Sequence, residues 1–108
     1  SHVAARDFSN AEKKILAIQQ RMKTLEKNYP DKYADYISDN PTHKFIVDVY
    51  NEKTNQTLRN LREQANVYRR MPGLTPKERT DLTKGIVGAQ NLVKRNILDM
   101  MDAMDLQY

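Results

Sequence analysis

The two longest helical patterns in the chain meet at the sequence Met71-Pro72-Gly73-Leu74-Thr75-Pro76-Lys77-Glu78. Pro72 and Gly73 are turn formers, and glycine readily adopts a positive φ. Thr75, Pro76 and Glu78 fit the N-cap, N1 and N3 positions of a capping box, in which the two polar side chains satisfy free backbone N–H groups. The stretch therefore predicts a sharp turn and a new helix that begins at Pro76.

Uninterrupted helical segments flank this turn on both sides. Asn40 and Pro41 make a good N-cap and first position, and no Gly or Pro follows before Met71. A helix over 41–71 would be a rod of about 46 Å, far longer than the ~13 Å radius of gyration of a compact chain of this size. After the turn, a helix is predicted over 76–104. The short turn makes the two helices an antiparallel hairpin, whose facing apolar pairs are Ala65 with Leu82, Leu61 with Ile86, Leu58 with Ala89, and Tyr50 with Ile97.

The residues before the hairpin predict two further helices. Apolar residues recur at alternating spacings of four and three from Ala11 to Tyr29, which indicates a helix over 10–28. Pro30 ends it, and a short linking helix is predicted over 31–38. We expect the first helix to lie along the groove of the hairpin. The predicted fold is all-α, an elongated three-helix bundle that forms a single domain.

The composition excludes several classes of protein. The 108 residues include 18 Lys and Arg, 14 Asp and Glu, 3 Gly, 4 Pro and no Cys, with a formal net charge of +4. So few turn formers argue against sheet-containing folds. The lack of cysteine excludes disulfide frameworks, thiolate zinc sites and cysteine nucleophiles. No apolar run approaches the ~20 residues of a membrane span, so we expect no membrane insertion and a soluble protein of the cytoplasm or of a virion.

Catalytic and cofactor sites are not predicted. We treat His43 as the only native histidine, and the serines other than Ser1 are Ser9 and Ser38. These residues provide no set of nucleophile, base and orienting group, and no His-x-x-x-His motif occurs. We expect no enzymatic activity, no cofactor and no metal. His43 is expected to face solvent in the first turn of its helix.

Polar residues and glycines interrupt the apolar stripes of the hairpin. The middle of its first helix predicts either a small-ligand pocket or hydrogen bonds across the hairpin among Thr54, Thr57 and Gln90. We favour the hydrogen bonds, because buried polar groups must be paired, and predict no small-molecule ligand. Gly85 and Gly88 predict a small-residue face that lets another helix approach closely.

Basic residues gather on one flank of the hairpin and around its turn. Such a surface could contact nucleic-acid phosphates, with Tyr68 available to stack on bases. The candidate nucleic-acid-binding residues are Arg59, Arg62, Arg69, Arg70, Lys77 and Arg79. Glu63, Glu78 and Asp81 lie among them and favour an ordinary solvated face. Nucleic-acid binding is therefore the alternative hypothesis.

The end of the chain is acidic and rich in methionine. Acidic residues at a helix C-terminus oppose the helix dipole, which suggests that something compensates them. Methionines adapt to varied partners. The candidate protein-interaction residues are Asp99, Asp102, Asp105, Met100, Met101 and Met104. The alternative is a solvated helix end whose methionines fill the core.

The hairpin resembles segments of a known class of protein. Leu58-Arg59-Asn60-Leu61-Arg62, the turn from Met71 to Arg79 and the helix Asn91–Ile97 resemble all-helical segments of very large phage and mobile-element proteins, the polyvalent and internal virion proteins. The resemblance covers residues 55–98, and no functional residue is carried over from it. It implies a helical spacer or docking module in a long chain that travels with DNA.

The expected function follows from these patterns. Ser1-His2 resembles the remnant of a cleaved purification tag, so we expect a piece excised from a longer, phage-type protein. We predict a non-enzymatic structural or protein–protein interaction module. Its partner is expected to be another protein or a second copy of the chain, with nucleic acid as the alternative.

Overall fold

The computed structural model describes residues 5–108, which contain helices and loops and no strand. The helices are α1 (Ala5–Asn28), α2 (Pro30–Asp39), α3 (Pro41–Val49), the π-helical turn η1 (Tyr50–Thr54), α4 (Asn55–Arg70) and α5 (Pro76–Ala103). The all-α class and the short linking helix are thus confirmed. The predicted tag remnant, Ser1-His2, lies outside the described residues.

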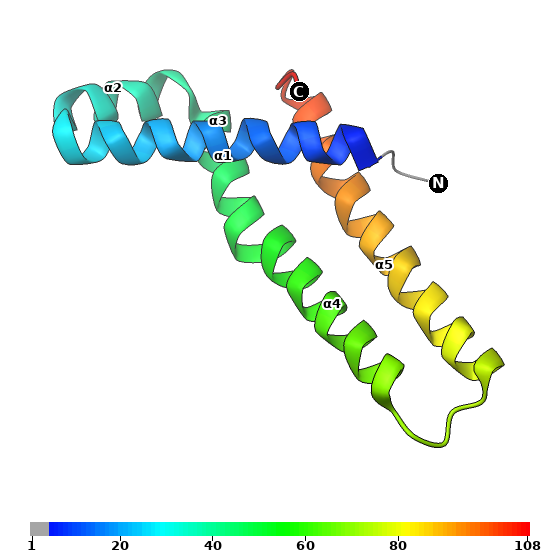
Figure 1. The fold of residues 1–108 in the computed structure, drawn as a ribbon. Helices are drawn as coiled ribbons and strands as arrows, with labels where there is room; N and C mark the ends of the chain where they lie inside the picture. Colours follow the sequence, from blue (N-terminus) through cyan, green and yellow to red (C-terminus); the bar gives the residue numbers. More distant parts are fainter. Residues whose placement is uncertain (1–4) are drawn as a thin grey trace.

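The hairpin turn forms as its residues predict. Gly73 has a φ of +84°, and α4 and α5 run antiparallel on either side of it (Figure 1). The Thr75 hydroxyl accepts a hydrogen bond from the backbone N–H of Glu78 at 3.1 Å, and the Glu78 carboxylate accepts one from the N–H of Thr75 at 3.0 Å. The hydrogen bond from the Thr75 backbone N–H, and then the Thr75 side chain, lower the pKa of Glu78. The capping box is therefore complete.

The molecule is elongated and has two parts. It measures 59 × 27 × 17 Å, with a radius of gyration of 17.6 Å. We call residues 5–54 and 97–108 the head, and residues 55–96, which are α4, the turn and most of α5, the arm. The arm is two helices thick and projects away from the head (Figure 1).

The first helix crosses the open end of the hairpin, which corrects its expected position along the hairpin groove. The buried side chains of α1 pack with those of α3, η1 and the end of α5. This cluster, the head core, consists of Ala11, Ile15, Ile18, Met22, Ile46, Val47, Tyr50, Ile97, Leu98, Met101 and Leu106. In the arm, the buried apolar residues are Leu58, Ala65 and Ile86, which α4 and α5 cover for each other. Because large apolar residues are concentrated at the open end, α1 buries its stripe there.

A π-helical turn interrupts the helix that was predicted to run unbroken over 41–71. Ile46, Tyr50, Thr54 and Leu58 are all buried and are spaced four residues apart. An α-helix has 3.6 residues per turn, so a stripe with this spacing would rotate by about 40° at each step. The wider π turn keeps the four side chains on one side. Among the described residues no side-chain hydrogen bond crosses the hairpin from Thr54, Thr57 or Gln90, so the predicted network is absent there.

Two side-chain hydrogen bonds attach α1 to the π turn. The Tyr50 hydroxyl donates to Glu12 Oε2 at 2.6 Å, and the Asn51 amide donates to Gln19 Oε1 at 2.8 Å. Tyr50 and Asn51 of this stretch therefore hydrogen-bond to the first helix. Both hydrogen bonds lie within the head.

Replacing Tyr50 by Phe (Y50F) is expected to lower the free energy of unfolding by about 1–2 kcal/mol near neutral pH, because the partly buried Glu12 carboxylate loses the hydroxyl that donates to it. Burial, and then the hydrogen bond to Glu12, raise the pKa of Tyr50 above its ordinary value of 10.0. The unfolded chain therefore loses this proton first as the pH rises, and the stability contributed by Tyr50 falls above about pH 10. Thermal melts of both proteins near pH 7 and near pH 11 should show the difference shrinking. A difference that does not change with pH would contradict the assignment.

Candidate interaction surface on the helical arm

Arg79 serves the structure of the arm, although it was a candidate for binding nucleic acid. Its guanidinium Nη1 donates to the carbonyl oxygens of Tyr68 at 2.5 Å and Arg69 at 2.9 Å, and Nη2 donates to that of Met71 at 3.3 Å. The last carbonyls of a helix have no partners within it and carry partial negative charge. Arg79 thus reaches from α5 to cap the C-terminus of α4.

The other five candidate basic residues are exposed. Lys77 forms an ion pair with Asp81 at 2.9 Å, with both side chains largely in solvent. Arg69 donates to Asn66 Oδ1 at 2.9 Å, and Arg62 Nε donates to its own helix at the carbonyl of Leu58 at 3.4 Å. Such surface contacts hold a side chain weakly, so these residues are able to exchange them for a partner.

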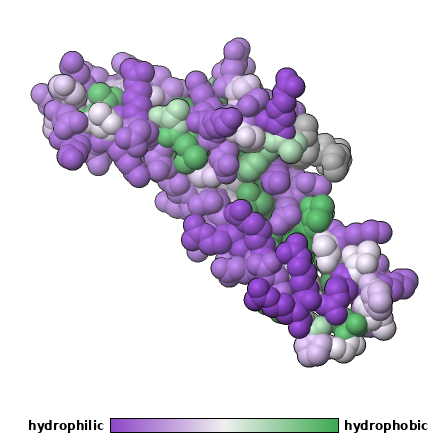
Figure 2. All heavy atoms as spheres, viewed as in Figure 1, coloured by the Kyte–Doolittle hydropathy of each residue, from purple (hydrophilic) through white to green (hydrophobic). Residues whose placement is uncertain are grey.

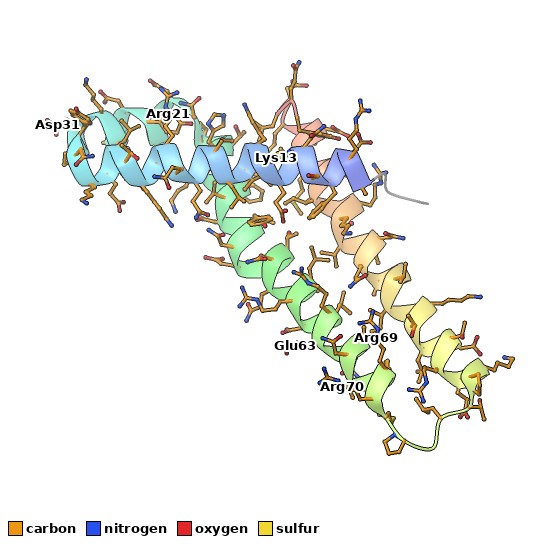
Figure 3. All side chains as sticks on the ribbon, in the orientation of Figure 1. Lys13, Arg21, Asp31, Glu63, Arg69 and Arg70 are labelled. Carbon is orange, nitrogen blue, oxygen red and sulfur yellow. The ribbon has the colours of Figure 1, made fainter. Side chains whose placement is uncertain are left out.

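The arm carries most of the positive charge. It contains nine Lys and Arg residues against only Glu63, Glu78 and Asp81, whereas the whole chain has a net charge of +4. Strongly hydrophilic side chains cover much of the arm, with small hydrophobic areas between them (Figure 2). Arg69 lies toward α5, while Glu63 and Arg70 lie on the other side of α4 (Figure 3).

A shallow groove of about 370 Å³ lies along the first half of α5. Its walls are Arg79, Thr80, Thr83, Lys84 and Val87. The Thr83 hydroxyl donates to the Arg79 carbonyl at 2.8 Å, so it is already satisfied, and the Val87 side chain is 46% exposed. The groove therefore offers apolar surface between cationic side chains. Thr80, Thr83, Lys84 and Val87 were not predicted as site residues; the available signal was a valine beside Ile86, off the apolar stripe.

The methionines at the acidic end of α5 pack against the head core, and the predicted protein-interaction site there stays a prediction. Met101 is 0% exposed, and Met100 and Met104 are half-buried against the head core. The alternative, that the methionines fill the core, is correct, because α1 covers this turn of α5. The acidic residues remain outside: Asp99 lies 3.9 Å from Arg95, Asp102 accepts from the Tyr108 hydroxyl at 3.0 Å, and Asp105 follows the helix with a φ of 56°.

His43 is half-buried, which corrects the expectation that it faces solvent. Its Nδ1 is hydrogen-bonded to the Tyr36 hydroxyl at 2.5 Å, and the two ring centroids are 5.5 Å apart. Burial lowers the pKa of His43, and the positive charges of Lys14 and Arg21 lower it further. The neutral imidazole therefore acts as a packing and hydrogen-bonding group between α2 and α3.

The glycines of α5 are open to solvent. A Cβ atom built at Gly85 or Gly88 would meet no atom within 4 Å. No helix within the described chain approaches this face, so the predicted close approach does not occur within one molecule.

Neither a metal site nor a membrane-spanning helix is found among residues 5–108. In residues 5–108, no group of three or more His, Cys, Asp or Glu side chains is placed to hold a metal ion. No helix in that range has the length and apolar character needed to cross a bilayer. Comparison with protein-family models, curated proteins and solved structures gave no match. The resemblance to phage and mobile-element proteins stays a prediction.

Proposed function

We propose that this chain is a non-catalytic interaction module whose arm docks an acidic surface of a partner protein. The observation that carries the proposal is the charge of the arm, where nine basic residues against three acidic ones surround exposed apolar surface. A positive surface speeds encounter with an acidic partner and selects against basic ones.

The head supports this role by holding the arm in place. Its core joins α1, α3 and the end of α5, and Tyr50 and Asn51 add hydrogen bonds to α1. An arm that is fixed before binding loses little conformational freedom when a partner docks.

The apolar groove favours a protein over a nucleic acid as the partner. Partner helices commonly insert apolar side chains into a groove while charged residues along its edges set the orientation. Val87, with Lys84 beside it, fits that mode. Single-stranded nucleic acids bind through bases stacked on aromatic rings. Tyr68 is the one aromatic residue of the arm, is half-buried, and lies about 100° around the helix from Arg69.

Binding to nucleic-acid phosphates is the second candidate function. It rests on Arg59, Arg62, Arg69 and Arg70, whose side chains are exposed and available for phosphate contacts. Such binding would weaken steeply with salt, in proportion to the number of phosphates contacted.

Photo-cross-linking in the cells that make this protein distinguishes the two candidates. A benzophenone amino acid at position 87 should form adducts with one or a few proteins, and the cross-linked peptides should be acidic. Reversing Arg59, Arg62 and Arg69 to Glu should remove most of these adducts, because attraction becomes repulsion. The readout is mass spectrometry of the adducts, with the same amino acid at exposed Ala34 in α2 as the matched control.

The possible outcomes separate clearly. Protein adducts at position 87, insensitive to nuclease and absent at position 34, support the proposal. Adducts only with nucleic acid would establish the second candidate. Equal labelling at the two positions, or no adduct at position 87, would refute docking on the arm.

A further inference from the structure

The outer side of α5 carries a second repeating pattern, separate from the stripe that faces α4. We call it the outer seam, and its residues are Asp81, Gly85, Gly88, Leu92, Arg95 and Asp99. Their spacings of four and three alternate, as in the contact line of two packed helices. Gly88 follows buried Ile86 by two residues, so the outer seam lies about 200° around the helix from the arm core. Most of the seam therefore faces away from the arm core, and Arg95 at its head end is partly buried.

The outer seam is unusually open. Leu92 is 64% exposed, the most exposed large apolar side chain among residues 5–108. Above Gly85 and Gly88 there is free space. Helix-interior glycines are unfavourable relative to alanine, and they are useful where another backbone must come close. Arg95 Nε is buried without a hydrogen-bond partner among the described residues.

We propose that the outer seam binds the same seam of a second copy of this chain, with the two α5 helices antiparallel and a two-fold axis at Gly88. In this register Leu92 enters a hole whose corners are Asp81, Lys84, Gly85 and Gly88 of the other copy. The same contact occurs twice, because a two-fold interface is self-complementary. Leu92, the large apolar residue of the seam, thus packs against Gly85 and Gly88 of the other copy, the smallest residues of the seam.

The charges of the seam select this arrangement. Antiparallel pairing about Gly88 places Arg95 opposite Asp81 of the other copy, and Asp99 opposite its Lys77. Parallel pairing in register would instead set Asp81 against Asp81 and Arg95 against Arg95, and like charges repel. Within one chain, the Arg95 and Asp99 side chains are 3.9 Å apart, so they are only loosely paired. The charge pattern therefore complements itself in the antiparallel direction alone.

The proposed dimer interface and the docking groove lie on adjoining faces of α5 and share Lys84, which lines the groove and forms one corner of the hole for Leu92. The two-fold axis is perpendicular to both helices, so corresponding faces of the two arms point the same way.

The lack of cysteine in the chain permits a direct test by disulfide formation. Gly88→Cys lies on the proposed axis, where two Cα atoms can approach within the ~4.4–6.8 Å that a disulfide requires. Under mild oxidation, G88C should form a covalent dimer in native buffer and not in denaturant. Val87→Cys is the control, since it is also exposed but lies about 100° around the helix. Equal cross-linking of the two variants would overturn the proposal.

Sedimentation equilibrium supplies a second measurement that needs no new covalent bond. Leu92→Glu should raise the dimer dissociation constant roughly tenfold or more. Asp81→Arg and Arg95→Asp should each weaken the dimer, and the double variant should restore it, because each reversed charge regains an opposite partner across the axis. The proposed dimer would be refuted if the unmodified protein remained monomeric at several hundred micromolar. It would also be refuted if the double variant dimerised more weakly than both single variants.

Discussion

Replacing Ile97 by Ala (I97A) is expected to lower the free energy of unfolding by about 2–5 kcal/mol. The Ile97 side chain is 1% exposed and lies in the head core with residues of α1, α3 and η1. Removing its outer carbons leaves a cavity that several helices border, and a closely packed core relaxes into such a space only partly. Since small domains are stable by only about 5–15 kcal/mol, this is a large fraction of the total.

The measurement is thermal unfolding followed by circular dichroism. A loss of this size should lower Tm by about 10–20 °C in a chain of this length. Val87→Ala is the matched control, because Val87 is in the same helix and is 46% exposed. Its effect should stay within about 0.5 kcal/mol, since alanine has the higher helix propensity and little burial is lost. If the Tm change for I97A were as small as that for V87A, the packing of Ile97 in the head core would be refuted.

The same substitution tests where the first helix packs. Backbone amides of α1 should exchange hydrogen faster in I97A, because α1 shares the head core with Ile97. If α1 instead lay along the arm, its protection would depend on arm residues. V87A would then loosen α1 more than I97A does.

The parts of the fold that could be predicted from sequence are those that neighbouring residues determine. Thr75 and Glu78 are three residues apart, and their mutual hydrogen bonds need nothing from the rest of the chain. Gly73 adopts a positive φ because glycine lacks a Cβ atom, and this needs no contact with distant residues. Proline and glycine positions likewise mark where most helices begin and end. The hairpin follows from these local features together with the facing apolar stripes.

The parts that could not be predicted depend on packing between distant segments. An apolar stripe such as that of α1 shows which side of a helix is buried and does not show against what. The π turn adjusts the stripe of one helix to a core that also includes α1 and α5, and its only signal was the four-residue spacing from Ile46 to Leu58. Gly85 and Gly88 predicted the close approach of another helix, and a small-residue face does not show whether that helix belongs to the same chain.

The arm site was predicted in part for the same reason. Positive charge is additive along the sequence, so the basic character of the arm is visible without a structure. The role of each arginine cannot be predicted from the sequence, because a long side chain can extend either into solvent or toward a nearby backbone. The Arg79 side chain extends toward the backbone, where it donates to three carbonyl oxygens.

Replacing Arg79 by Ala (R79A) is expected to lower the free energy of unfolding by about 2–3 kcal/mol, since a charged donor to several carbonyls is lost at a partly solvated site. The carbonyls of Tyr68, Arg69 and Met71 lose their partner on α5, and the negative end of the α4 dipole loses the facing charge. The last turn of α4 should fray first, because few other contacts hold the tip of the arm. Hydrogen exchange in residues 66–71 should therefore quicken more than exchange in the head.

Two further substitutions separate capping from binding. Arg70→Ala removes the same charge from an exposed side chain at the same helix end, and it should change the stability by no more than about 0.5 kcal/mol. Arg79→Lys keeps the charge but loses the planar fork that reaches several acceptors, so it should restore less than half of the loss. If R79A proved as mild as R70A and instead reduced the binding of duplex DNA, Arg79 would be a phosphate ligand after all. The expected result, a strong effect on stability with Arg70 as the weak control, assigns the Arg79 guanidinium to capping and leaves the charge available for docking to the exposed basic residues of the arm.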